Sequence, residues 1–131
     1  GLCVDAFGGL PGVDTAHYCT QFGYDKSDDN NVRALLEQMQ HQDNRRAALV
    51  STLVAVRSPQ DPEPLIAVGR VVGEITRERR GSNGFGFDPV MFLPQLGKTF
   101  AELPTAVKNA YSHRGSASQQ MLALLRERWL K

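Results

Sequence analysis

Segment 81–89 gathers residue types that suit a ligand-binding loop: three glycines, two phenylalanines and an aspartate. Glycine adopts positive φ at no steric cost, so such a backbone can approach a ligand closely. A single glycine separates Phe85 from Phe87, so one ring can face a planar base while the other faces the core. Asp88, held in an extended conformation before Pro89, supplies a fixed acceptor. These features predict a loop that binds a flat ring.

A second polar block, 108–115, carries three potential cations, Lys108, His113 and Arg114. Lysine and arginine bind phosphate oxygens or a keto oxygen through charge-assisted hydrogen bonds. A phenylalanine that stacks on a base contributes roughly 1–3 kcal/mol. Loop and block together predict an anionic ligand with a flat ring, which is the chemistry of a nucleotide.

Taken singly, these residues also have structural explanations. Phe85 is a typical core side chain, Asp88 is a typical turn cap, and His113 is a typical structural hydrogen-bonding residue. Their combination favours the ligand site.

Three blocks in order, 81–89, 97–103 and 108–115, resemble in sequence and spacing the Ham1/RdgB family of inosine and xanthosine triphosphate pyrophosphatases. Segment 1–12 resembles the stretch that follows the aspartate-aspartate-serine motif of that family. The resemblance therefore runs from end to end of the chain. It implies hydrolysis of non-canonical purine nucleoside triphosphates (ITP, dITP and XTP) to the monophosphate and pyrophosphate, with Mg²⁺ bridging the phosphates.

The resemblance also implies which residues bind the substrate. They are Phe85, Phe87, Asp88, Lys108, Ser112, His113 and Arg114. Phe85 would stack on the purine, Asp88 would orient the base or ribose, and Lys108 would meet polar groups of the nucleotide. Ser112, His113 and Arg114 would line the base pocket.

Base selectivity follows from hydrogen bonding. Inosine and xanthosine carry an oxygen at C6, where adenosine carries an amino group. Donors on His113 and Arg114 would form hydrogen bonds with that oxygen, and adenine would leave them without a partner. Guanine also carries that oxygen, so its exclusion requires crowding at its 2-amino group.

The start of the chain departs from the family pattern. Family members begin with a strand and a Thr/Ser-x-Asn-x-x-Lys phosphate motif, followed by a metal-binding glutamate and an aspartate pair, and none of these occurs here. The general-base aspartate would lie just before Gly1, so no catalytic and no metal-binding residue is predicted, and Asp5 is interpreted as a structural or secondary metal-site residue. We expect a single partial domain over residues 1–131, the C-terminal two-thirds of the family domain, with little turnover alone.

Two alternatives stay open. One is a non-catalytic nucleotide-binding fragment or dimer subunit. The other is a module that binds single-stranded nucleic acid through the basic run 77–80 beside Phe85 and Phe87. The balanced charge argues against the second.

The composition gives neither a net charge that would attract nucleic acid nor an apolar segment that would span a membrane. Fifteen Lys and Arg against fourteen Asp and Glu give a formal net charge of +1, and the apolar stretches 47–56 and 65–72 are too short and interrupted to cross a bilayer. Cys3 and Cys19 are too few for a disulfide framework and favour a reducing, cytoplasmic location. The family resemblance implies a homodimer.

The sequence of the first half predicts a short strand, a helix and a pair of long strands. We expect a strand over 1–6, turns over 8–12 and irregular chain to Tyr24. Ser27 is expected to cap a helix whose buried stripe is Val32, Leu35, Leu36 and Met39. Runs 47–56 and 65–75 predict an antiparallel hairpin turning at 58–62, with Gly69 and Gly73 marking bulges or close packing.

The second half predicts a strand over 90–93, a turn or short helix over 100–103, a helix from Pro104 or Thr105 to about Ala110, and an amphipathic helix over 117–130. The apolar stripe of this last helix is Met121, Leu124, Leu125 and Trp129. The fold class is therefore α/β (mixed α+β). The family adds an elongated mixed β-sheet flanked by helices, in two lobes with a cleft.

Overall fold

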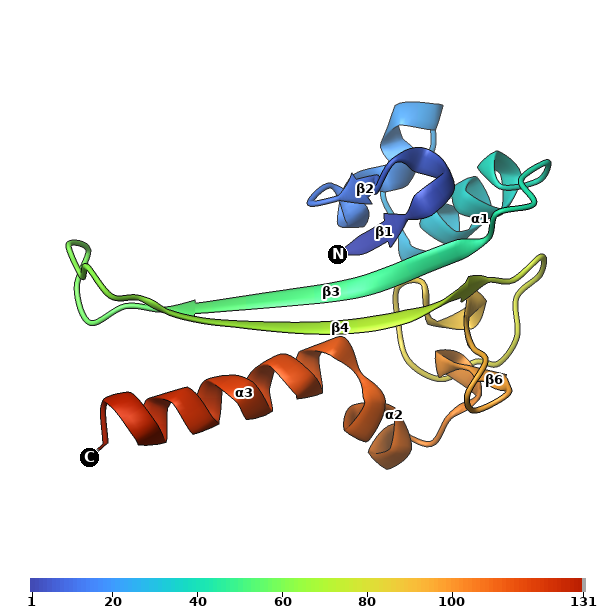
Figure 1. Ribbon diagram of the computed structural model, residues 1–131. Coiled ribbons are helices and arrows are strands. Elements are labelled where there is room, and N and C mark those ends of the chain that lie inside the picture. The colour runs from blue at the N-terminus through green and yellow to red at the C-terminus, as the bar shows by residue number, and fades with distance from the viewer. Residues whose placement is uncertain (131) are drawn as a thin grey trace.

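A long antiparallel hairpin runs the length of the molecule in the computed structural model, which describes residues 1–130 (Figure 1). Its strands are β3 (Arg46–Ala55) and β4 (Leu65–Ile75), paired without interruption from Arg46↔Glu74 to Ala55↔Leu65. At the turn, Asp61 accepts backbone hydrogen bonds from Arg57 at 2.8 Å and Glu63 at 2.9 Å. The predicted hairpin is confirmed.

The hairpin is the centre of a six-stranded sheet with the order β2-β1-β3-β4-β5-β6. The outer strands are β1 (Leu2–Val4), β2 (Pro11–Gly12), β5 (Met91–Leu93) and β6 (Lys98–Thr99). Every pairing among the described residues is antiparallel. The predicted α/β class, an elongated sheet flanked by helices, is confirmed, but this part of the chain shows no parallel pair to make the sheet mixed.

One lobe lies on the β1–β2 side of the hairpin. It contains two 3₁₀ segments, η1 (Asp5–Phe7) and η2 (Thr15–Phe22), and helix α1 (Asp28–Gln38). The Ser27 hydroxyl accepts a hydrogen bond from the Asn30 amide at 3.0 Å, which confirms the predicted cap. The predicted stripe of α1 packs into the main core. The stretch expected to be irregular is instead largely η2.

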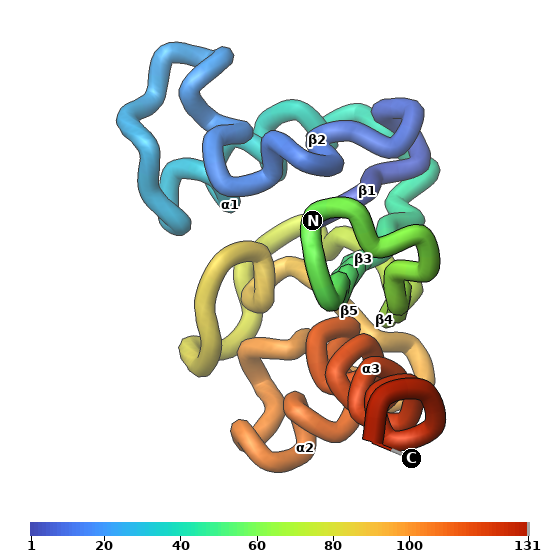
Figure 2. Tube along the Cα trace, turned by 90° about the vertical axis from the view of Figure 1, so that its left-hand side faces the viewer, coloured from blue at the N-terminus to red at the C-terminus, as the bar shows by residue number. Residues whose placement is uncertain are grey.

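Helices α2 (Thr105–Tyr111) and α3 (His113–Arg128) lie on the opposite side of the hairpin, so an end view shows α1 with β1 and β2, then the hairpin, then α2 with α3 (Figure 2). A second, smaller core joins α3 to the hairpin through Leu65, Ala67 and Met121, with Leu124, Leu125 and Trp129 against them. The predicted stripe of the last helix is confirmed. The helix begins at His113, earlier than the expected residue 117.

Gly69 explains how α3 reaches the sheet. A Cβ atom at this position would collide with the carbonyl oxygen of His113 and lie 2.7 Å from the Ala117 nitrogen. The strand register continues unbroken through Gly69, so it marks close packing and not a bulge. The missing side chain therefore lets the first turns of α3 rest directly on β4.

The remaining segments are the 3₁₀ turns η3 (Asp88–Val90) and η4 (Phe100–Glu102), the latter closed by a capping box between Thr99 and Glu102. The short strand and the turn expected in this region are confirmed. Among residues 1–130 we find no helix with both the length and the apolar character needed to cross a bilayer.

Candidate functional site

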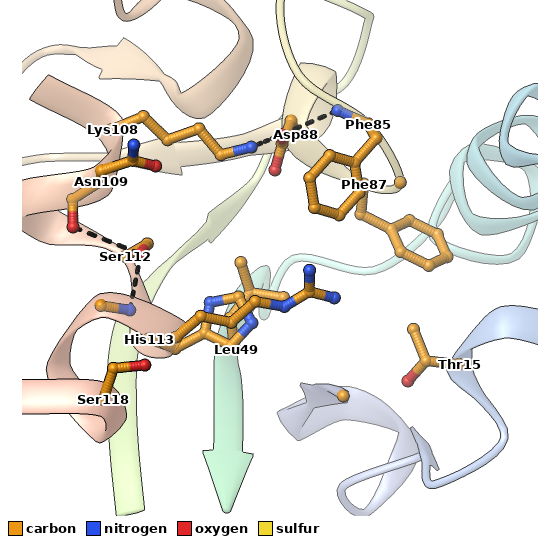
Figure 3. A pocket seen from close by; sticks show the side chains of 14 residues that line it. Thr15, Leu49, Phe85, Phe87, Asp88, Lys108, Asn109, Ser112, His113 and Ser118 are labelled. Carbon is orange, nitrogen blue, oxygen red and sulfur yellow. Dashed lines mark hydrogen bonds and ion pairs between the residues drawn. The ribbon is translucent and has the colours of Figure 1, made fainter. Parts of the chain in front are cut away.

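One pocket of about 330 Å³ brings together all the residues predicted to bind substrate. They are Phe85, Phe87, Asp88, Lys108, Ser112, His113 and Arg114. The pocket opens between the glycine loop 81–87 with η3 on one side and the α2–α3 corner on the other (Figure 3). Segments that are separate in the sequence therefore form a single concave site.

Phe85 presents an exposed ring at this pocket. Its side chain is 55% exposed, so its interpretation as a core residue is wrong. Lys108 Nζ lies 4.3 Å from the ring centroid and Arg114 Cζ lies 4.9 Å from it. The negative face of an aromatic ring attracts such cations. The ring is therefore exposed at the pocket and lies in contact with two positive charges.

Phe87 turns the other way. It is only 5% exposed and packs edge-on against Tyr18, with ring centroids 6.4 Å apart. As expected, one ring is exposed and the other packs in the core, while binding of a ligand by Phe85 stays a prediction. Phe87 still borders the pocket, but most of its ring belongs to the core, and a substrate contact for it stays a prediction.

Asp88 and Lys108 form a largely buried ion pair at the base of the loop. Lys108 Nζ donates to Asp88 Oδ2 at 2.6 Å, and the side chains are 15% and 9% exposed respectively. The same oxygen accepts the Phe85 amide at 3.0 Å, so Asp88 also caps the turn. Gly84, at φ +80°, leaves the room for this carboxylate, since a Cβ atom there would collide with Asp88 Oδ2. The two residues thus fix the loop to α2.

Ser112 forms the corner between α2 and α3. It follows the last residue of α2, and its hydroxyl accepts the Gly115 amide at 3.0 Å as the cap of α3. A Cβ atom on Gly115 would collide with the carbonyl oxygen of Asn109, so this glycine permits the tight corner. Ser112 lines the pocket as predicted, and its oxygen also accepts the capping amide of Gly115.

His113 is a neutral imidazole at pH 7. Burial is the main cause that lowers the pKa of His113 from 6.5 to about 4, and the positive charge of Arg114 contributes to the shift. Its Nδ1 atom is buried and has no hydrogen-bond partner among residues 1–130. A neutral imidazole has one donor and one acceptor nitrogen. The side chain can thus offer one N–H to a ligand.

Apart from glycines, four further residues line the pocket without having been predicted to bind substrate: Thr15, Leu49, Asn109 and Ser118. Asn109 lies within the recognised polar block. Thr15 and Leu49 come from the other lobe and the hairpin, and only the fold brings them here. Thr15 Oγ1 already bonds the Leu2 amide at 2.8 Å and the Gly12 carbonyl.

The described residues do not fit a protein-ligated magnesium ion. Within residues 1–130 no group of three or more His, Cys, Asp or Glu side chains is placed to hold a metal. Asp88 is neutralised by Lys108, and Asp5 lies 3.8 Å from Arg46 at the surface. Since Mg²⁺ prefers oxygen ligands from one or two carboxylates with phosphate, the described residues of this pocket do not match a site for that ion.

The arrangement required for a nucleic-acid module is absent from the described residues. Arg79 pairs with Asp29 at 2.7 Å, and Arg80 lies over the ring of Phe92. With Phe87 buried, only Phe85 of the two rings is exposed. The basic run and the two rings therefore do not form the stacking surface that this alternative needs.

The sequence of this chain is similar to one family of known proteins. The Ham1 family matches residues 1–124. The dITP/XTP pyrophosphatase of Verminephrobacter eiseniae is 82% identical over 130 residues, which is 99% of this chain and 65% of that protein. The dITP/XTP pyrophosphatase of Delftia acidovorans is 73% identical over 131 residues, 100% of this chain and 66% of that protein. This chain thus spans about 65% of the length of these curated relatives.

Solved structures show the same likeness. A HAM1 protein from Coxiella burnetii superposes with a TM-score of 0.90 at 37% identity, covering 97% of this chain and 64% of that one. The Ham1 protein of Staphylococcus aureus gives a TM-score of 0.87 at 38% identity, with the same coverage of 97% and 64%. The fold and the sequence therefore point to one family.

Proposed function

Because this chain belongs to the Ham1 family, we propose that it forms the purine-binding part of an enzyme that hydrolyses ITP, dITP and XTP to the monophosphate and pyrophosphate. The observation that carries the proposal is the exposed ring of Phe85 beside Lys108 and Arg114 in one pocket. A ring, two cations and a neutral imidazole suit a purine nucleotide.

Stacking on Phe85 holds the base, and it contributes roughly 1–3 kcal/mol. Arg114 and the N–H of His113 then donate to the oxygen at C6 of inosine or xanthosine. Adenine presents an amino group there, which leaves these donors unpaired, and a donor that a bound base shields from water without pairing is costly. This difference gives the preference for the non-canonical bases.

Mg²⁺ is the metal we propose for the complete enzyme. When bound to the phosphates it screens their charge and aligns the scissile bond. Within residues 1–130 no group of three or more His, Cys, Asp or Glu side chains is placed to hold this ion. The residues described here bind and orient the base.

That same observation favours a second candidate, a non-catalytic nucleotide-binding unit. Such a unit would use the same pocket and the same base preference. The two candidates differ only in whether pyrophosphate is released.

The test compares inosine with adenosine nucleotides. Calorimetric titration of the 131-residue protein with IMP and AMP measures binding, and pyrophosphate release from ITP and ATP by the full-length gene product with Mg²⁺ measures turnover. We expect tighter binding of IMP, lost in Arg114→Ala and kept in Arg126→Ala, an exposed arginine of the same helix. Equal binding of IMP and AMP would overturn the proposal. Selective binding without pyrophosphate release would favour the non-catalytic unit.

Location and assembly remain part of the proposal. The free thiols of Cys3 and Cys19 suit the cytoplasm. A homodimer follows from the family resemblance, and the mass in solution at several concentrations checks it.

A further inference from the structure

One hydrogen bond joins the first residue of α1 to the glycine loop across the two lobes. Asp28 Oδ2 accepts the Gly86 amide at 3.0 Å. Beside it, Asp29 pairs with Arg79 at 2.7 Å and accepts a second bond from the same guanidinium at 3.0 Å through its carbonyl. The α1 end of one lobe is thus tied to both ends of the segment that carries Phe85.

Packing does not fix this part of the loop. Gly86 lies at φ +59°, and a Cβ atom there would meet nothing within 4 Å. Behind the loop lies a hollow of about 180 Å³, bordered by Asp28, Val32, Phe85 and Gly86. Since little apolar contact supports the loop from this side, its position depends on polar contacts.

Two of those contacts bracket the exposed ring. The Phe85 amide donates to Asp88 Oδ2 at 3.0 Å, and the next amide, that of Gly86, donates to Asp28 Oδ2 at 3.0 Å. Asp88 is itself held by Lys108, which also lines the purine pocket. Asp28 is outside that pocket and acts on the loop from the opposite side.

We propose that Asp28 is a positioning residue, which holds the glycine loop so that the ring of Phe85 stands in the purine pocket. This inference rests on the proposed base-binding function. Without the Asp28 carboxylate the loop can relax into the hollow behind it, and the ring leaves its place beside Lys108 and Arg114. The affinity for the base is then lowered.

The first test measures binding of IMP to the 131-residue protein by calorimetry. Asp28→Ala is expected to weaken binding about three- to tenfold, the loss of one charge-assisted hydrogen bond. Asp28→Asn keeps an acceptor oxygen and is expected to restore most of the affinity. Asp43→Ala removes an exposed aspartate that makes no side-chain bond among the described residues, and it is expected to bind IMP like the unsubstituted protein.

The second test is hydrogen exchange of the Gly86 amide, followed by NMR without nucleotide. Exchange is expected to accelerate severalfold in Asp28→Ala and to slow again in Asp28→Asn, because a hydrogen-bonded amide is protected. Thermal unfolding of each variant separates this local effect from a general loss of stability.

The outcomes distinguish the two proposals. If the unsubstituted protein prefers IMP to AMP and Asp28→Ala binds IMP equally well, the positioning role is overturned while the base-binding function stands. If affinity falls in Asp28→Ala but Asp28→Asn does not recover it and Gly86 exchange is unchanged, the positioning role is also overturned. If the unsubstituted protein binds neither nucleotide, both proposals fail.

Discussion

Lys108 on α2 and Asp88 after the glycine loop are joined across the floor of the pocket, with Nζ 2.6 Å from Oδ2. Both side chains are largely buried, so neither charge is well screened by solvent. The pair therefore has a structural effect in addition to any contact with a nucleotide, because it holds the two walls of the pocket together.

Removing one member of this pair should destabilise the fold. In Lys108→Met the Asp88 carboxylate remains buried with only the Phe85 amide as partner, and we expect a loss of about 3 kcal/mol in the free energy of unfolding, measured with urea. Arg33→Met breaks an exposed pair with Asp29 at 3.9 Å and should cost less than about 1 kcal/mol. Similar losses in both variants would contradict the burial of the Lys108–Asp88 pair.

The two phenylalanines of the loop should respond in opposite ways to truncation. Phe85→Ala removes an exposed ring, so we expect stability to change by no more than about 0.5 kcal/mol while nucleotide affinity falls roughly five- to a hundredfold. Phe87→Ala removes a ring that is 5% exposed and should cost about 3–5 kcal/mol of stability. A stable Phe85→Ala protein with full affinity for IMP would exclude stacking on this ring.

A single methyl group at Gly69 should disturb the pocket from a distance. In Gly69→Ala the added carbon meets the backbone of His113 and Ala117, so α3 must move away from β4. We expect a loss of roughly 2–3 kcal/mol in stability, together with weaker binding of IMP, since His113 and Arg114 move with the helix. Val68→Ala, a partly exposed neighbour on the same strand, is the control and should leave binding unchanged.

The titration of His113 should make stability depend on pH. Its pKa is about 4 in the folded protein and about 6.5 when unfolded, so between these values the unfolded chain binds a proton that the folded chain does not. Stability is therefore expected to fall as the pH drops from 6.5 to 4, by about 1–2 kcal/mol once solvent screening of this half-buried group is allowed for. In His113→Gln this part of the pH dependence should vanish. The free energy of unfolding is measured with urea at pH 4.5, 5.5 and 6.5, and the same dependence on pH in the variant and the unsubstituted protein would contradict the lowered pKa.

The sequence predicts the parts of this fold that depend on local pattern. Runs of small, β-branched and leucine residues on either side of a proline-containing turn locate the β3–β4 hairpin, and the apolar period of three and four locates the buried faces of α1 and α3. The order of Phe85 and Phe87 about one glycine also predicts that their rings face opposite ways, as the structure shows.

Other features depend on contacts between distant segments and could not be found locally. The start of α3 is hidden because Gly115 has a low helix propensity, whereas its actual role is to let the helix pass close to Asn109. Thr15 and Leu49 carry no local sign of a site, since only the folded sheet places them at the pocket. The ion pair of Asp88 with Lys108 is likewise a consequence of how η3 and α2 pack.

Ser112 serves both as the residue that ends α2 and as the one that begins α3. One extended residue is therefore all that separates the two helices, and the direction of α3 relative to α2 depends on the backbone of Ser112. Lys108 on α2 and Arg114 on α3 reach the same pocket from the two sides of this corner. A substitution at Ser112 would thus change the distance between two positive charges without removing either one.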